Sequence, residues 1–201
     1  MKDFRDIKRL EHVKRGIEVA CIGNFHLLLL GPNYSGKRTL ADITMEMMNR
    51  LNKSIIISIA KPCPCGNFTD YKKKCTCSPL DITKHLAKIW KLHQECEMVV
   101  EVPHVAYQST NRNGEATEDI ETRIKNTPRT IYDNVSKIEL SEDAHSILKT
   151  AVLELGISIT SYDSIMRIAR VIADMDPSKK VEGHHISEAI GYRILDRSMW
   201  D

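Results

Sequence analysis

The sequence predicts an α/β fold with a small core of three parallel strands and a bundle of helices behind it. Short apolar runs at residues 26–30, 54–60 and 98–103 alternate with stretches of helical spacing, which is typical of buried parallel strands covered by helices. From about residue 118 onward, the apolar residues recur at helical spacing. A polar stretch at 107–117 indicates a linker between the two parts.

Helices are expected on either side of each strand in the first part. Apolar residues at helical spacing predict helices over residues 3–24, 37–51 and 80–93. Gly23 and Asn24 end the first of these patterns, and Pro103 stops the third strand. The first part is therefore expected to form one α/β domain over residues 1–106.

The second part is expected to hold three main helices. Ser141 is a good N-cap, and Gly156 stands where the same helix should end. The next helix stops before Pro177, and the last carries apolar residues from Ile186 to Ile194. We expect a linker and helix over 107–134 and a helical lid domain over 135–201.

Composition sets broad limits on function. The chain has 201 residues, of which 42% are hydrophobic and 28% charged, as expected for a globular protein. The net charge of +2 does not by itself require nucleic acid or a membrane as partner. No membrane span and no secretory signal are visible, so a cytoplasmic location is the default expectation.

A glycine-containing loop follows the first strand and opens the next helix. Its sequence fits the pattern G-x-x-x-x-G-K, in which backbone N–H groups wrap a phosphate and the lysine reaches the outer phosphates. The alternative is an ordinary strand–helix turn with a solvated lysine. The expected nucleotide-binding residues are Gly31, Pro32, Asn33, Tyr34, Ser35, Gly36, Lys37, Arg38 and Thr39.

The loop departs from the usual pattern directly after the lysine. Arg38 stands where a Ser or Thr hydroxyl normally holds Mg²⁺. Thr39 is one residue further along and is rotated by about 100° around the helix. We therefore expect ATP or ADP to bind with weak dependence on Mg²⁺. Arg38 either pairs with phosphate or is a solvated surface arginine.

Four of the six cysteines lie within fifteen residues, in the irregular segment 61–79. Reduced thiols clustered in this way indicate a tetrahedral zinc site, and a closed site with four cysteines is structural rather than catalytic. Reduced thiols without a metal, or a redox pair, are the alternatives. The predicted zinc ligands are Cys63, Cys65, Cys75 and Cys77.

Other candidate groups have simpler explanations. Cys21 and Cys96 stand in apolar surroundings and are expected in the core. His184 and His185 are expected in a solvated first turn of a helix, without ligand partners nearby. The run Lys72 to Lys74 would offset thiolate charge, and it is a weak candidate for contact with nucleic acid phosphates.

Several segments, spread over nearly the whole chain, match one known family in that family's order, and they are 4–8, 12–20, 24–32, 61–66, 75–79, 168–174 and 188–197. In these segments the chain resembles the Mg-chelatase-like AAA+ family of the ComM/YifB type. The resemblance implies a ring-forming ATPase relative that binds ATP or ADP and assembles as a homo- or hetero-oligomer, and the ComM type is linked to DNA processing.

The resemblance also shows what the chain lacks. The family's core has five parallel strands in the spatial order 5-1-4-3-2, and this chain retains the counterparts of 5, 1 and 4. The strand ending in Asp-Glu, which supports Mg²⁺ and the attacking water, is missing. Lys61, Leu92 to Glu95 and Thr160 replace further family residues that act in catalysis. Because phosphoryl transfer needs these parts, little or no hydrolysis is expected.

Three functions remain open at this point. The first is a nucleotide-binding regulatory or assembly subunit with little ATPase activity. The second is a zinc-stapled interaction module that has lost nucleotide binding. The third is an ATPase that a partner subunit completes. Lys37 with its glycines favours the first over the second, and the missing acidic strand disfavours the third.

Overall fold

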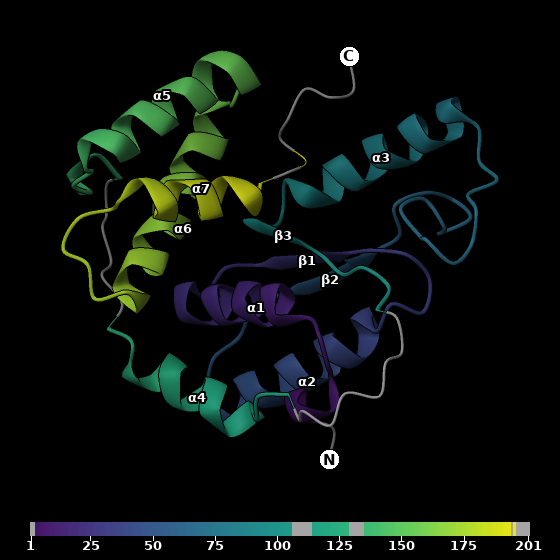
Figure 1. The fold of residues 1–201 in the computed structure, drawn as a ribbon, viewed down its shortest axis with the longest axis horizontal. Helices are drawn as coiled ribbons and strands as arrows, with labels where there is room; N and C mark the ends of the chain where they lie inside the picture. Colours follow the sequence, from purple (N-terminus) through teal and green to yellow (C-terminus); the bar gives the residue numbers. More distant parts are fainter. Residues whose placement is uncertain (1–2, 106–113, 129–134, 194, 196–201) are drawn as a thin grey trace. The chain divides into compact units, whose positions relative to one another are not determined.

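The computed structural model describes residues 3–105, 114–128, 135–193 and 195 (Figure 1). The chain divides into two compact units, residues 1–125 and 126–201. The first unit contains the sheet, and the second contains helices. None of the helices in the described ranges is both long and apolar enough to span a bilayer.

The first unit is built on a three-stranded parallel sheet. Its strands are β1 (Leu27–Leu30), β2 (Ile57–Ala60) and β3 (Met98–Glu101), in the order β2-β1-β3. Leu27 pairs with both Ile57 and Met98, so all three strands end at the same edge. All four residues of β1 are buried, as expected for a central strand that is covered on both faces.

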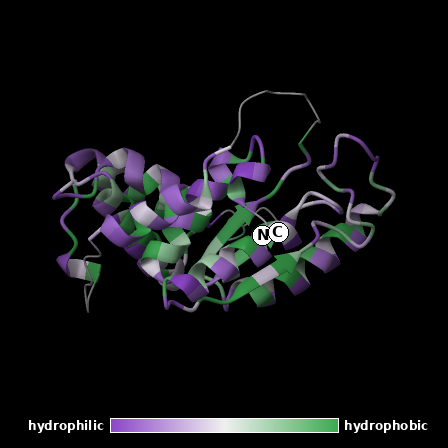
Figure 2. Cartoon of the chain, turned by 90° about the horizontal axis from the view of Figure 1, so that it is seen from below, coloured by the Kyte–Doolittle hydropathy of each residue, from purple (hydrophilic) through white to green (hydrophobic). Residues whose placement is uncertain are grey.

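This arrangement confirms the predicted α/β fold and its three parallel strands. The chain's first strand lies in the centre, with the second and third on opposite sides. Figure 2 shows hydrophobic residues along the strands and on helix faces.

Four helices belong mainly to this unit. They are α1 (Glu11–Gly23), α2 (Lys37–Arg50), α3 (Pro79–His93) and α4 (Thr117–Asn126). The predictions for 37–51 and 80–93 agree with α2 and α3 to within one residue at each end. The helix predicted over 3–24 is wrong in its first part, because α1 begins only at Glu11.

Tertiary contacts explain the break before α1. Residues Phe4–Asp6 form one turn of 3-10 helix, and Arg9 takes a left-handed conformation with φ of 61°. Phe4 is fully buried, and its backbone N–H donates to Thr117 Oγ1 at 3.0 Å. The entry segment is therefore fixed by distant partners, which local helical spacing does not reveal.

The second unit contains α5 (Glu142–Leu155), α6 (Ile159–Met175) and α7 (Gly183–Gly191). Ser141 caps α5 through its side chain, and Gly156 ends it in a left-handed conformation, as predicted. Helix α7 packs against both α5 and α6. Ile194, expected in the last helix, lies outside the described residues.

Candidate functional site

The predicted phosphate loop connects the central strand β1 to α2, and α2 begins at Lys37. Gly31 leaves the strand under close packing, since a Cβ atom there would collide with the carbonyl oxygen of Val102. Gly36 has φ of 93°, a conformation that suits glycine. The loop therefore lies at the carboxyl edge of the sheet and leads into a helix N-terminus, the position where parallel α/β sheets bind ligands.

Lys37 folds back onto the loop that precedes it. Its Nζ donates to the carbonyl oxygens of Gly31 at 2.7 Å and Pro32 at 2.5 Å, and it lies 3.2 Å from Ser35 Oγ. Burial of the amine, together with the nearby charge of Lys61, lowers the pKa of Lys37 to about 8. The loop thus holds the buried amine of Lys37 in place by hydrogen bonds.

A cleft of about 520 Å³ opens beside this loop. Residues of the loop and of α2 form one wall, and side chains from three other segments complete it. Six of the lining residues offer cationic or hydrogen-bond-donating groups that suit an anionic ligand, namely Ser35, Gly36, Thr39, Lys8, Lys72 and His104.

The remaining predicted loop residues differ in their exposure and in whether they line the cleft. Tyr34 also lines the cleft but is 91% exposed. Arg38 is exposed and is not among the lining residues, whereas Thr39 is. Among the described lining residues the one carboxylate is Asp6, which already accepts a hydrogen bond from the backbone of Asp3 at 3.3 Å.

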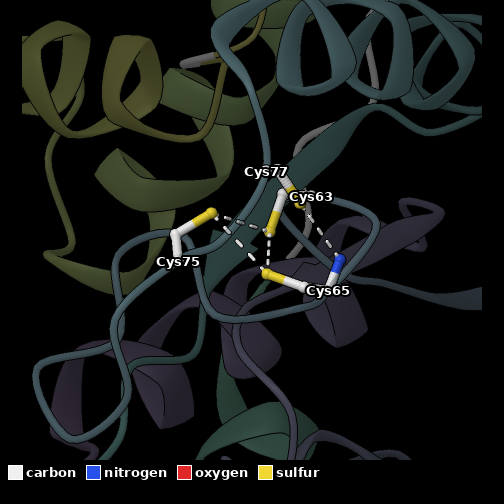
Figure 3. A group of neighbouring side chains, drawn as sticks. All are labelled: Cys63, Cys65, Cys75 and Cys77. Atoms are coloured by element: carbon white, nitrogen blue, oxygen red, sulfur yellow. Dashed lines mark hydrogen bonds between the residues drawn. The ribbon is translucent and has the colours of Figure 1, made fainter.

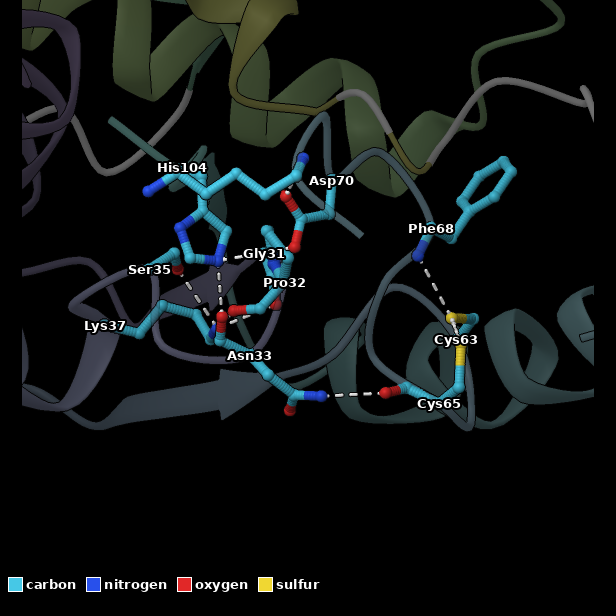
Figure 4. A network of polar contacts seen from close by, with 11 residues as sticks. Gly31, Pro32, Asn33, Ser35, Lys37, Cys63, Cys65, Phe68, Asp70 and His104 are labelled. Carbon is cyan, nitrogen blue, oxygen red and sulfur yellow. Dashed lines mark hydrogen bonds and ion pairs between the residues drawn. The ribbon is translucent and has the colours of Figure 1, made fainter. Parts of the chain in front are cut away.

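Asn33 joins the loop to the cysteine segment (Figure 4). Its side-chain Nδ2 donates to the carbonyl oxygen of Cys65 at 2.7 Å, and its backbone N–H donates to that of Gly66 at 3.0 Å. His104 Nε2 donates to the Asn33 carbonyl oxygen at 2.6 Å and lies 3.5 Å from Asp70 Oδ2. Asn33 therefore contacts two other segments, the cysteine segment and the residues that follow β3.

The four cysteines predicted as zinc ligands converge (Figure 3). Their sulfur atoms all lie within 4.8 Å of one another. Cys63 Sγ lies 3.4 Å from that of Cys65 and 3.7 Å from that of Cys75, and Cys65 and Cys75 are 3.6 Å apart. Zinc bound tetrahedrally at about 2.3 Å from each sulfur requires sulfurs about 3.8 Å apart, so the donor set fits this ion.

The local electrostatics also suit a divalent cation. Backbone N–H groups of Thr76 and Asn67 hold the pKa of the Cys65 thiol at about 5. The Cys65 amide lowers the pKa of Cys77, but burial and the neighbouring sulfurs raise it more, to about 12. Four adjacent thiols cannot all ionise by themselves, whereas a bound metal removes their mutual repulsion.

Sequence reasoning missed two residues near the site, Asp70 and His104, and it placed Lys72 only in a lysine run that offsets thiolate charge or contacts nucleic acid phosphates. Lys72, from the cysteine segment, lines the cleft. Asp70 is buried, with a side chain 2% exposed, and pairs with His104. His104 follows β3 by three residues, so the rule that ligands bind beyond the carboxyl ends of parallel strands could have indicated it. The other two depend on how the cysteine segment folds back.

The expectation for the two C-terminal histidines is wrong in part. His184 is exposed, but His185 is fully buried, and both lie near Asp176. The Glu182 backbone N–H donates to His185 Nδ1 at 2.9 Å, so Nε2 carries the proton and faces Asp176 Oδ2 at 3.2 Å. Burial, and the neighbouring His184, lower the pKa of His185. With both ring nitrogens engaged, the cluster suits capping of α7 and not metal binding.

Cys21 and Cys96 are buried, as predicted. Burial raises the pKa of the Cys21 thiol to about 12, so it is protonated at neutral pH. Both behave as small apolar residues of the core.

Comparison with known proteins then places the chain. The description "Magnesium chelatase, subunit ChlI" matches residues 3–61 and 51–110, and "Magnesium chelatase, subunit ChlI C-terminal" matches residues 99–193. The chain belongs to the magnesium-chelatase family. Within this Mg-chelatase-like family it is of the ComM/YifB type, because the curated relatives that it matches carry these names.

The competence protein ComM of Haemophilus influenzae is 23% identical over 71% of this chain and 31% of its own length. The YifB protein of Salmonella typhimurium is 24% identical over 80% of this chain and 34% of its own length. The Escherichia coli YifB protein is 23% identical with the same coverage. This Mg-chelatase-like chain thus spans about a third of the length of the curated relatives it matches.

Proposed function

We propose that this Mg-chelatase-like chain binds ATP or ADP through residues 31–39, with weak dependence on Mg²⁺ and little or no hydrolysis. The observation that carries the proposal is the burial and hydrogen bonding of the Lys37 amine. Its amine is buried against Gly31, Pro32 and Ser35 at the entrance to α2, beside a cleft with basic walls. A phosphate group would replace the loop carbonyls as the partner of that amine.

Weak Mg²⁺ dependence follows from what lines the cleft. Arg38 stands at the position of the metal-holding hydroxyl, and Asp6 is the one carboxylate among the described lining residues. The two segments matched by the family description meet at residues 51–61, where the resemblance implies two missing strands. A site without those acids lacks the groups that position Mg²⁺ and the attacking water.

Nucleotide binding is tested by calorimetry with ADP or ATP, with and without Mg²⁺, on the wild type and on Lys37→Ala. We expect the substitution to weaken binding about 100-fold, because a charged hydrogen-bond donor to phosphate is lost. Lys73→Ala, an exposed lysine outside the cleft, is the matched control and should bind as the wild type does. Absence of binding in the wild type at millimolar nucleotide would refute the proposal.

The metal position offers a second test. Arg38→Ser places a hydroxyl directly after the lysine, and we expect Mg²⁺ to increase its ATP affinity several-fold while leaving the wild-type affinity nearly unchanged. Thr39→Ser keeps a hydroxyl at the neighbouring position and is the matched control. If the wild type already needs Mg²⁺ for binding, Arg38 does not have the role assigned to it.

We also propose that the cysteine segment holds one structural zinc ion through Cys63, Cys65, Cys75 and Cys77. Converging sulfurs with spacings near the tetrahedral value support this. Metal analysis of protein purified under reducing conditions should give one zinc per chain. A chain that is fully folded and metal-free would contradict it.

The wider role is proposed from the family alone. The three-stranded sheet would be a reduced AAA+ core and α5–α7 its lid, and the chain would act as a regulatory or assembly subunit within an oligomer of AAA+ relatives. A link to DNA processing follows only from what the resemblance to the ComM type implies. Measuring the molecular mass of the protein in solution, with and without nucleotide, tests whether it forms an oligomer.

A zinc-stapled interaction module is the second candidate. Tyr71 is 62% exposed and Phe68 37% exposed on the cysteine segment, so aromatic side chains are available to a protein partner. This reading predicts zinc binding without nucleotide binding, so the ADP experiment decides between the two.

A further inference from the structure

The phosphate loop and the cysteine segment share Asn33. Two of its donors reach the cysteine segment, namely Nδ2 to the Cys65 carbonyl and the backbone N–H to the Gly66 carbonyl. Asn33 lies between the loop and the cysteines in Figure 4. The position of this loop residue therefore depends on where the two carbonyl groups stand.

Those carbonyls belong to the turn that carries the first two candidate metal ligands. The Gly66 backbone N–H closes the turn on the Cys63 carbonyl at 2.9 Å, and the Phe68 N–H donates to Cys63 Sγ at 3.2 Å. Gly66 has φ of 77°, and a Cβ atom there would collide with the Asn33 side chain. One turn thus serves both the metal site and the phosphate loop.

The middle of the cysteine segment also contacts Asn33, through His104. Asp70 is buried against His104, whose Nε2 donates to the Asn33 carbonyl. The Lys72 backbone N–H donates to Asp70 Oδ1 at 2.8 Å, and Lys72 lines the cleft. The segment between the second and third candidate metal ligands therefore supplies a cationic wall of the cleft.

We propose that metal binding by the four cysteines and nucleotide binding by the phosphate loop are thermodynamically linked, with Asn33 as the positioning residue of the link and Lys72 as an additional contact to phosphate. This inference rests on the proposed nucleotide function. A bound metal fixes the Cys65–Gly66 turn and the arm that carries Asp70 and Lys72. Without metal, nucleotide binding must order these residues itself, which weakens the observed affinity.

The size of the effect follows from the contacts at stake. The link involves two hydrogen bonds from Asn33 and the cationic side chain of Lys72. From these contacts we expect zinc to tighten ADP binding about tenfold. Because linkage is reciprocal, ADP must tighten zinc binding by the same factor. The effect of zinc on ADP affinity and the effect of ADP on zinc affinity, measured independently, must therefore be the same factor.

The test uses the full chain. ADP affinity is measured on zinc-loaded and on chelator-treated protein, and zinc affinity is measured by chelator competition with and without ADP. Equal factors of about ten support the link. If zinc-loaded protein binds no ADP, the proposed function is wrong and the link with it. If ADP binds equally with and without zinc, nucleotide binding stands and the link is wrong.

Asn33→Asp tests the route, because it replaces the donor to Cys65 by an acceptor of the same shape. The ratio of ADP affinities with and without zinc cancels any direct effect on either ligand, and we expect it to fall to about one. Asn52→Asp is the matched control, at the opposite end of α2 and about 20 Å away. It should keep the tenfold ratio. A full tenfold ratio in Asn33→Asp would show that the link does not pass through Asn33.

Lys72→Ala and Lys73→Ala separate the contact from general charge. Both side chains are exposed lysines of the same run, and only Lys72 lines the cleft. In zinc-loaded protein we expect ADP affinity to fall about fivefold for Lys72→Ala and to stay unchanged for Lys73→Ala. Equal effects of the two substitutions would remove Lys72 from the site.

Discussion

The phosphate loop and the cysteine segment occupy equivalent places and are held in opposite ways. Each follows a strand at the carboxyl edge of one parallel sheet, after β1 and β2 respectively. The loop closes on itself through the Lys37 amine and leads directly into α2. The cysteine segment is mostly exposed, and its sulfurs gather around a common point.

The difference shows two routes to an ordered loop. The phosphate loop draws most of its order from a buried strand, a helix and the Lys37 hydrogen bonds, and only Asn33 depends on the cysteine segment. The segment 61–79 has few buried side chains, and ordering each of its residues costs about 1–2 kcal/mol of backbone entropy. We infer that a metal offsets that cost.

The largest expected effect comes from removing zinc. A structural zinc contributes about 10–16 kcal/mol of apparent binding free energy in small peptides. Chelation, or Cys75→Ser, should therefore raise amide hydrogen exchange in residues 61–79 by orders of magnitude. Exchange in α2 should change little, because that helix is held by the core. Equal hydrogen exchange in residues 61–79 with and without zinc would show that the cysteine segment does not depend on a metal for its order.

The pH dependence of ADP binding tests the role of the Lys37 amine in the phosphate loop. The pKa of Lys37 is about 8 in the free protein, and phosphate binds its protonated form. Binding must therefore take up a proton above that pH, so affinity should fall by up to about tenfold per pH unit from pH 8 upward. Calorimetry between pH 7.5 and 9.5 measures the slope, which Lys37→Ala should flatten. An affinity independent of pH would mean that the amine keeps its ordinary pKa.

The smallest effect concerns the other cluster of ligand-type side chains, at Asp176, His184 and His185. Both ring nitrogens of His185 are engaged, so zinc titration should give no second equivalent. The folded-state pKa of His185 is lowered, so the unfolded chain binds its proton more readily. Stability should therefore fall as the pH drops below about 6.5, by at most about 1.4 kcal/mol per pH unit. His185→Asn should lessen this loss in thermal melts; an unchanged pH profile would contradict it.

Sequence patterns predicted the sheet and most helices because the relevant signals are local. Ser141 and Gly156 mark the ends of α5 by their own chemistry. The spacing of the cysteines predicted their convergence for the same reason. The break before α1 was missed, because burial of Phe4 and its bond to Thr117 join residues far apart in the sequence.

The same limit applies at the site. Asn33 could be assigned to the phosphate loop from its neighbours, but its bond to Cys65 spans 32 residues. His185 was expected in solvent because a double histidine at a helix start is usually polar surface. Only the fold shows that its ring accepts from the Glu182 backbone and faces Asp176.

The order β2-β1-β3 leaves β2 at an edge of the sheet, with Ile56 60% and Ile59 44% exposed. Strand edges with exposed apolar residues tend to recruit strands from other molecules. Here β2 is only four residues long, and short edge strands are one way in which natural proteins limit such self-association. Because β1 lies between β2 and β3, the strand that carries the phosphate loop is paired on both sides.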